Sequence, residues 1–115
     1  MSPGVGGGGV TAKTETVNAG PVGLFAADGV YGNFSARGFF IVRHGDRLFA
    51  LSAVCTHRKC AVAAEPDGSF YCRCHGSTFD PNGRVTKGPA SRDLPLLSAY
   101  TNEQLQFLVN VPSER

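Results

Sequence analysis

The sequence predicts an all-β protein whose short antiparallel strands form a sandwich or a barrel-like fold. Its apolar runs, rich in Phe, Val, Ile and Leu, are short, and turns containing Gly, Pro and Asp separate them. No stretch shows sustained helical periodicity. Many short strands joined by such turns are typical of sandwiches and barrels, and a chain of 115 residues suits one domain with a modest core.

The chain is expected to begin with a flexible tail. Gly dominates its first part, and we place the tail at residues 1–19. After it, residues 22–27 and 31–35 are short apolar runs. Because Asp28-Gly29 between them is a common turn sequence, these two runs are predicted to form a hairpin.

Two denser runs, residues 39–42 and 48–51, predict a second hairpin. Residues 44–46 between them (His-Gly-Asp) offer a tight turn in which Gly takes the strained position. His44 is therefore expected to be a solvated turn residue and not a ligand. Because the hairpin leads directly to Cys55, rigid strands are expected to present the loop that follows.

The rest of the chain continues the pattern of strands and turns. Turns containing Pro and Gly are predicted at residues 65–68 and 80–83. A strand is predicted to start at residues 70–71. Residues 104–109 alternate in polarity, with Leu105, Phe107 and Val109 on one face. This alternation predicts a half-buried strand.

Cysteine and histidine are concentrated in two short blocks, residues 55–60 (Cys-Thr-His-Arg-Lys-Cys) and 72–77 (Cys-Arg-Cys-His-Gly-Ser). The blocks contain all four cysteines and two of the three histidines. C-x-H followed by C-x-x-H supplies two thiolates and two imidazoles, a set that transition metals of borderline softness accept. The blocks therefore predict a metal site.

These blocks resemble the motif of the Rieske iron-sulfur proteins, C-x-H followed after a gap by C-x-x-H. The gap here, residues 58–71, is slightly short for the family. The resemblance implies one 2Fe-2S cluster per chain, with Cys55 and Cys72 on one iron and His57 and His75 on the other.

The same resemblance implies the fold and its division. The Rieske fold is an antiparallel β-sandwich with a small inserted cluster-binding subdomain, which agrees with the all-β outline. We expect a single Rieske domain over residues 20–115, with the cluster-binding subdomain at about residues 53–90.

Four residues beside the ligands acquire roles by resemblance. Cys60 and Cys74 match a pair that forms a disulfide between the cluster loops in quinol-oxidising complexes and in other high-potential members. Gly88 and Pro89 resemble a proline-containing loop that covers the cluster. A plain surface turn requires the same two residues, so this alternative stays open.

Ser77 and Phe79 resemble tuning positions. High-potential members carry a Ser at the first position, and its hydroxyl donates to a cluster sulfide, which raises the potential. A loop-closing hydroxyl is the alternative role for Ser77. Phe79 stands where those members have a Tyr that donates to a ligand cysteine, and because Phe has no donor the potential is expected to be lower than theirs.

Structural zinc is the main alternative to the cluster, because two cysteines and two histidines also form a common tetrahedral zinc set. Zinc fingers favour a pair of cysteines followed by a pair of histidines, whereas here each block contributes one ligand of each type. The spacing argues against a zinc-stabilised interaction module. A domain held by disulfides alone, with incidental histidines, is a second alternative.

The function expected from these features is one-electron transfer without a substrate site. Neither positioned carboxylates, a Ser-His-Asp arrangement nor a phosphate-binding Gly loop was identified, so the chain is not expected to be an enzyme by itself. Electrons would pass between partner redox proteins through the edge bearing His57 and His75. A high-potential domain of an oxidoreductase complex is favoured, and a ferredoxin shuttle to an oxygenase or reductase is the alternative.

Charge and hydropathy limit the partners and the location. A net charge of +2 does not favour nucleic acid, and no stretch is long and apolar enough to span a membrane. Arg58, Lys59 and Arg73 have no acidic neighbour within the blocks. We favour the interpretation that they are solvated loop charges. The alternative is that they dock against an acidic face on a partner protein. No targeting signal was recognised, so a cytoplasmic location is expected, or a periplasmic or complex-associated one if a targeting segment was removed.

Overall fold

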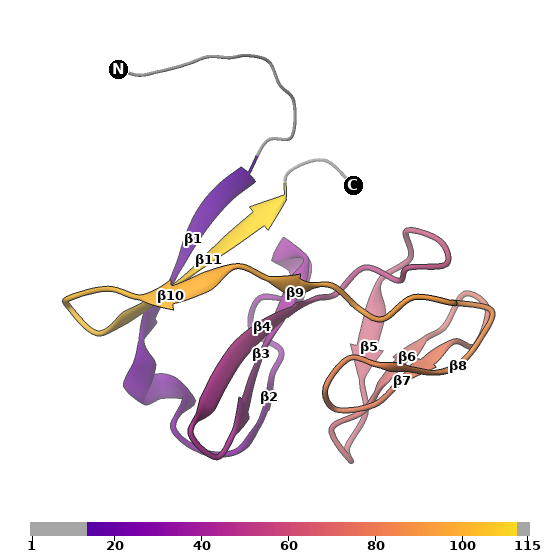
Figure 1. Ribbon diagram of the computed structural model, residues 1–115, viewed down its shortest axis with the longest axis horizontal. Helices are drawn as coiled ribbons and strands as arrows, with labels where there is room; N and C mark the ends of the chain where they lie inside the picture. The colour runs from indigo at the N-terminus through magenta and orange to yellow at the C-terminus, as the bar shows by residue number, and fades with distance from the viewer. Residues whose placement is uncertain (1–13, 113–115) are drawn as a thin grey trace.

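The computed structural model describes residues 14–112. Their strands form three antiparallel sheets (Figure 1). The first sheet has the order β1-β11-β10 and contains β1 (Thr14–Pro21), β10 (Ala99–Thr101) and β11 (Gln106–Pro112). The second has the order β2-β3-β4-β9 and contains β2 (Gly29–Tyr31), β3 (Phe39–His44), β4 (Arg47–Ser52) and β9 (Leu96–Leu97). The third contains β5 (Val62–Ala64), β6 (Phe70–Cys72), β7 (Thr78–Phe79) and β8 (Val85–Lys87) in sequence order. These sheets confirm the all-β prediction.

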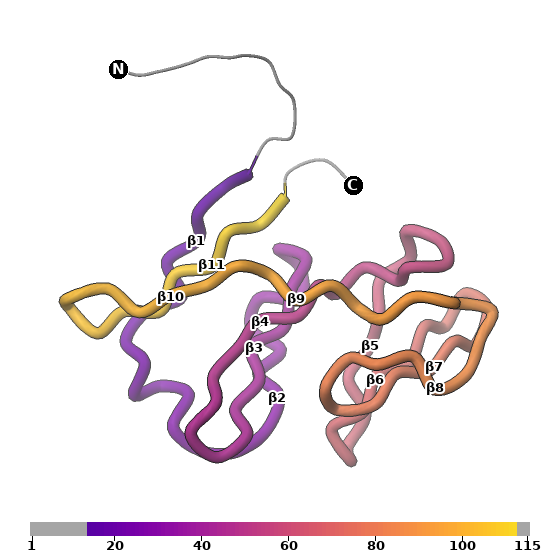
Figure 2. Tube along the Cα trace, in the orientation of Figure 1, coloured from indigo at the N-terminus to yellow at the C-terminus, as the bar shows by residue number. Residues whose placement is uncertain are grey.

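In Figure 2 the β3–β4 hairpin lies between the first sheet and the third sheet. The hairpin contributes side chains to two hydrophobic cores. Phe39 and Ile41 of β3 face the first sheet, where they pack with residues such as Val109. Phe40 and Val42 face the opposite way, into the core shared with the third sheet. Burial on both faces explains why β3 is a continuous apolar run rather than an alternating one.

The third sheet is an insertion in the sandwich. Its four strands lie between β4 and β9 in the sequence, yet β4 and β9 are hydrogen-bonded neighbours, with Ala50 opposite Leu97. Phe70 and Phe79, both fully buried, pack with Leu51 in the core that joins this sheet to the β3–β4 hairpin. The arrangement is the predicted β-sandwich with a small inserted unit.

The turns were predicted correctly from local sequence. Gly45 and Asp46 form the tight turn between β3 and β4, and Gly45 has the positive φ of 60° that such a turn requires. His44 differs from the prediction, because it is the last residue of β3 and is half-buried, with its ring centroid 5.8 Å from that of Phe49. The turns at residues 65–68 and 80–83 close with backbone hydrogen bonds of 2.9 and 2.8 Å.

The predicted hairpin of residues 22–27 with 31–35 was wrong. Val22–Phe25 forms a short 3-10 turn, η2, and the second 3-10 turn, η3, spans Ser35–Arg37. The strand that follows Asp28, β2, pairs with β3 instead. The longer β3 offers a complete partner edge, and the Asp28 carboxylate accepts a hydrogen bond from the Gly45 N–H at 2.9 Å, which ties this segment to the β3–β4 turn.

The tail is shorter than predicted, since residues 14–19 belong to β1. That strand pairs with β11 and buries Val17 and Ala19, which alternate with polar residues. Two small apolar residues were too weak a signal to reveal a strand in the sequence. Residues 1–13 of the predicted tail lie outside the described residues.

The last strand was predicted to start at residue 104, but it starts later in the chain. β11 starts at Gln106, whereas Leu105 has a φ of 62° and is 63% exposed. The Asn102 side chain accepts hydrogen bonds from the N–H groups of Gln104 and Gln106, so residues 102–105 form a turn. Burial of Phe107 and Val109 on one face is confirmed.

Among residues 14–112, no helix is long and apolar enough to cross a membrane.

Candidate metal centre

The first block forms a loop between β4 and β5. A bridge between Val54 and Ala61 closes the base of the loop, and the Cys55 N–H donates to the Cys60 carbonyl at 2.8 Å. The Cys60 N–H in turn donates to the Arg58 carbonyl at 2.7 Å. These bonds hold Cys55 at the start of the loop, where its side chain is only 3% exposed.

The second block is a tighter loop between β6 and β7. The Cys72 N–H donates to the Ser77 carbonyl, and the Gly76 N–H donates to the Cys72 carbonyl, both at 2.9 Å. Gly76 has a φ of 84°, a conformation that side chains disfavour, so Gly at this position allows the chain to turn back. The loop buries Cys72, whereas Arg73, Cys74 and His75 are exposed.

A disulfide between Cys60 and Cys74 joins the two loops, which confirms the disulfide suggested by the family resemblance. The Cα atoms of the two residues are 6.4 Å apart. Once oxidised, neither sulfur is a thiolate that can bind a metal. The sulfur atoms of Cys60, Cys72 and Cys74 lie within 4.8 Å of one another, but this close group contains both disulfide sulfurs and so is not a ligand set.

Two thiols and two imidazoles are therefore available between the loops. Cys55 and Cys72 are free and buried. The rings of His57 and His75 are nearly perpendicular, with centroids 5.0 Å apart, and His75 is the more exposed of the two. The structure thus brings the two buried thiols together and the two more exposed imidazoles together, on the same pair of loops.

The two thiols differ in acidity. Burial raises the pKa of Cys55, but the backbone N–H groups of His57 and Arg58, with the side chains of Cys72 and Ser77, outweigh burial and leave the pKa lowered. Burial also raises the pKa of Cys72, and Cys55 adds to that rise, so the pKa remains raised. Hydrogen-bond donors around Cys55 therefore already favour a negative sulfur there.

Ser77 connects the second loop to the proline-containing loop. Its side chain is fully buried, and its oxygen accepts a hydrogen bond from the Ala90 N–H at 2.9 Å. The Ser77 side chain also lowers the pKa of the Cys55 thiol. Ser77 therefore closes the loop, and its effect on the potential stays a prediction. Gly88 and Pro89, which precede Ala90, are exposed.

A second contact between these loops was not foreseen. The Thr56 hydroxyl donates to the Arg92 carbonyl at 2.6 Å, and the Arg92 guanidinium donates to the Thr56 carbonyl at 3.5 Å. Thr56 lies between two predicted ligands, so this pair fixes the third loop beside them. No local sequence pattern reveals a partner 36 residues away.

Phe79 lies beneath the loops, on β7. Its side chain is fully buried in the core formed with Phe40 and Phe70, whose ring centroids are 5.1 Å apart. Phe79 contributes bulk and no hydrogen-bond donor, and its effect on the potential stays a prediction.

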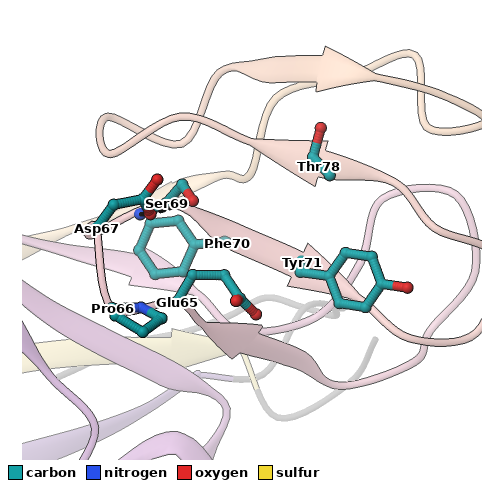
Figure 3. Close-up of a pocket in the computed structure, with 7 residues that line it drawn as sticks. All are labelled: Glu65, Pro66, Asp67, Ser69, Phe70, Tyr71 and Thr78. Carbon is teal, nitrogen blue, oxygen red and sulfur yellow. Dashed lines mark hydrogen bonds between the residues drawn. The ribbon is translucent and has the colours of Figure 1, made fainter.

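A wide groove in the described part of the chain lies elsewhere, on the third sheet (Figure 3). It has a volume of about 570 Å³ and is lined by Glu65, Pro66, Asp67, Ser69, Phe70, Tyr71 and Thr78. In Figure 3, Asp67 and Ser69 lie together at one end and Tyr71 and Thr78 at the other. The Asp67 carboxylate accepts a hydrogen bond from the Ser69 N–H at 2.9 Å, and the Ser69 side chain and N–H lower its pKa. The groove contains none of the predicted ligands.

A β-sandwich with an inserted sheet, whose disulfide-linked loops carry two buried thiols and two more exposed imidazoles, has the donor set of a small metal-centre protein. The Rieske [2Fe-2S] domain model matches residues 12–101, and the chain belongs to this family. Its cofactor is accordingly a 2Fe-2S cluster, which decides against the zinc and disulfide-only alternatives.

Relatives and solved structures agree with this assignment. The chain is 38% identical over 112 residues to the cytochrome b6-f complex iron-sulfur subunit of Trichodesmium erythraeum, covering 89% of this chain and 63% of that protein. It is 35% identical over 123 residues to cytochrome b6-f complex iron-sulfur subunit 2 of Synechocystis, covering 98% of this chain and 68% of the relative. The chain thus spans less than two thirds of the first relative.

A solved structure shows the same fold. The cyanobacterial plasma membrane Rieske protein PetC3 from Synechocystis matches with a TM-score of 0.59 and 29% identity. The match covers 81% of this chain and 97% of that structure. The fold expected from the sequence resemblance is therefore confirmed.

Proposed function

We propose that Cys55, His57, Cys72 and His75 hold the 2Fe-2S cluster and that the chain carries single electrons as a Rieske domain of the high-potential type. The observation that carries this proposal is the disulfide between the loops. It removes two of the four cysteines as ligands and leaves two thiols and two imidazoles on the linked loops. That donor set fits a Rieske cluster.

The ligand chemistry favours a higher potential than that of an all-cysteine cluster. Each imidazole binds as a neutral group, whereas each thiolate carries a negative charge, so an added electron meets less repulsion. Rieske centres lie at about −150 to +300 mV, against about −400 mV for plant-type ferredoxins. Buried Cys55 and Cys72 keep water from the sulfur side, while exposed His75 offers the edge at which a partner can approach.

Neighbouring groups adjust the potential within that range. The Ser77 hydroxyl and the N–H groups near Cys55 stabilise negative charge on sulfur, which favours the reduced state. Phe79 offers no further donor. We therefore place the midpoint among the high-potential members, and below that of a protein with a Tyr in place of Phe79.

The proposed setting is an oxidoreductase complex in which the chain is the iron-sulfur domain and has no substrate site of its own. The relatives named as cytochrome b6-f subunits and the disulfide support this setting. Within the chain, residues from about 53 to 90 form the proposed cluster-binding subdomain. A ferredoxin shuttle is the second candidate, favoured by the missing donor at Phe79.

Serine substitution of single cysteines tests the ligand assignment. Cys55→Ser and Cys72→Ser are expected to purify with little iron and without the electron paramagnetic resonance signal of a reduced Rieske centre. The double variant Cys60→Ser with Cys74→Ser removes the disulfide, whose two cysteines lie outside the proposed set, and it should retain iron and signal. Loss of the cluster only in the double variant would contradict the assignment.

A further inference from the structure

We infer that the surface around the proposed histidine ligands docks a redox partner protein through an acidic face on that partner. This inference rests on the proposed function, because it takes the two imidazoles as the place where the electron enters or leaves. The surface, called the basic rim below, consists of Arg58, Lys59, Arg73 and Arg92.

Two members of the basic rim flank the disulfide. Lys59 precedes Cys60 and Arg73 precedes Cys74, and the Cα atoms of the two cysteines are only 6.4 Å apart. Both basic residues are exposed. Exposed basic residues from two loops that are separate in the sequence therefore flank the same cross-link.

The other two members lie at the ligands themselves. Arg58 follows His57 directly and is exposed. Arg92 is exposed and reaches the first loop, where its guanidinium donates to the Thr56 carbonyl at 3.5 Å. Since the rings of His57 and His75 are in contact, the basic rim draws on all three loops around them.

Nothing in these loops neutralises the basic rim. Residues 53–64, 70–79 and 84–92 contain no Asp or Glu. Glu65, Asp80 and Asp93 flank these ranges in the sequence. Asp80 and Asp93 accept hydrogen bonds at 2.9 Å from backbone N–H groups: the first from Asn82 and Arg84, the second from Val85. Within residues 14–112, the one ion pair joins Arg37 to Glu15, outside these loops.

The chemistry of the basic rim selects its partner. Docking against an apolar surface would bury guanidinium and ammonium groups without partners, which is unfavourable. The large apolar side chains that are exposed in residues 14–112 lie on other segments: Leu24, Leu96, Tyr100 and Leu105. An acidic face would instead pair the charges at its edge and speed the encounter.

Cytochrome c and its succinylated form provide a matched pair of test partners, because succinylation turns basic lysines into carboxylates on the same haem protein. The domain is first shown to hold its cluster by electron paramagnetic resonance; failure at this step would refute the proposed function and not the docking surface. Transfer of one electron from the reduced domain to the ferric haem is then followed by stopped-flow absorbance. We expect succinylated cytochrome c to react faster at low salt and to lose most of that advantage at about 0.15 M ionic strength, where charges are screened beyond about 8 Å.

Two double variants that each remove the same charge show which part of the surface sets the rate with succinylated cytochrome c. Arg58→Gln with Lys59→Gln should slow the reaction with succinylated cytochrome c about threefold to tenfold at low salt. Arg47→Gln with Arg84→Gln removes the same charge from a groove that these two residues line with Asp93, and it should change the rate little. Isothermal titration calorimetry should show the same order of affinities without electron transfer.

Two results would overturn the inference. Equal rates for both cytochromes, or an equal effect of the two double variants, would show that the basic rim does not select an acidic protein. Binding to phosphatidylglycerol vesicles that is lost in the Arg58 and Lys59 variant, together with equal rates for both cytochromes, would instead assign the basic rim to an anionic membrane surface.

Discussion

At the scale of single residues, Ser77 shows how one buried group serves both the loops and the proposed cluster. Its oxygen accepts from Ala90 while its hydroxyl contacts Cys55, so it holds the third loop in place and favours negative charge on sulfur. Phe79 lies in the same core but provides no donor. Because Ser77 has a hydrogen-bond donor and Phe79 has none, adding a donor at residue 79 tests how hydrogen bonds set the midpoint potential.

Phe79→Tyr is expected to raise the midpoint potential by about 40 mV, which for one electron corresponds to roughly 1 kcal/mol, the scale of a single hydrogen bond. The added hydroxyl would donate to a ligand sulfur and stabilise the reduced form more than the oxidised form. Phe79→Leu, which adds no donor, is the control and should leave the midpoint nearly unchanged. Protein-film voltammetry measures both, and the absence of any rise in the Tyr variant would count against this role.

At the scale of elements, the two ligand loops depend on a cross-link and on a tight junction with the sandwich. The disulfide closes a segment with a sequence separation of 14. Gly83 lies where the turn before β8 approaches β4, and its carbonyl accepts from the Leu94 N–H at 2.8 Å. Each feature makes a separate prediction about stability.

Removing the disulfide by Cys60→Ser with Cys74→Ser should lower the free energy of unfolding by about 3 kcal/mol, the typical contribution of a bridge across a loop of this length. The reason is that the unfolded chain gains freedom that the cross-link had removed. Urea unfolding of both proteins, each with its cluster bound, measures the difference. An unchanged unfolding midpoint would show that the other loop contacts suffice.

Gly83→Ala should destabilise the domain by about 2 to 3 kcal/mol, because it combines a strained backbone with overpacking. Gly83 has a φ of 88°, and an added Cβ would lie 3.0 Å from a methyl carbon of Leu51. Gly45→Ala is the matched control, since Gly45 has a φ of 60° but open space around it. Thermal unfolding should rank the Gly83 variant as the less stable; the reverse order would contradict this reading of the junction.

At the scale of the whole molecule, the features predicted correctly from the sequence are those encoded locally. The two Cys and His blocks and the turns at residues 45–46, 65–68 and 80–83 are short patterns whose chemistry is complete within a few residues. Their local character explains why the loop bearing Cys55 and the strand leading to Cys72 were expected in the right places.

The features that were missed depend on partners distant in the sequence. β1 has only Val17 and Ala19 to mark it and is a strand because β11 lies beside it. β2 pairs with β3 rather than with residues 22–27, a choice made by the available edge and not by the Asp28-Gly29 turn sequence. The contact of Thr56 with Arg92 likewise arises only when the chain folds. Sequence therefore indicated the chemistry of the centre better than the packing that surrounds it.

The most direct test of the central claim is a redox titration of the purified domain at several pH values, followed by visible circular dichroism and electron paramagnetic resonance. We expect an iron-sulfur signal with a positive midpoint that falls as pH rises through neutral, approaching about 59 mV per pH unit for each proton coupled to the electron. The reason is that reduction strengthens proton binding at the second ring nitrogen of His57 or His75. A negative midpoint that does not change near neutral pH would contradict the high-potential assignment, and zinc or no metal with no signal would contradict the cluster itself.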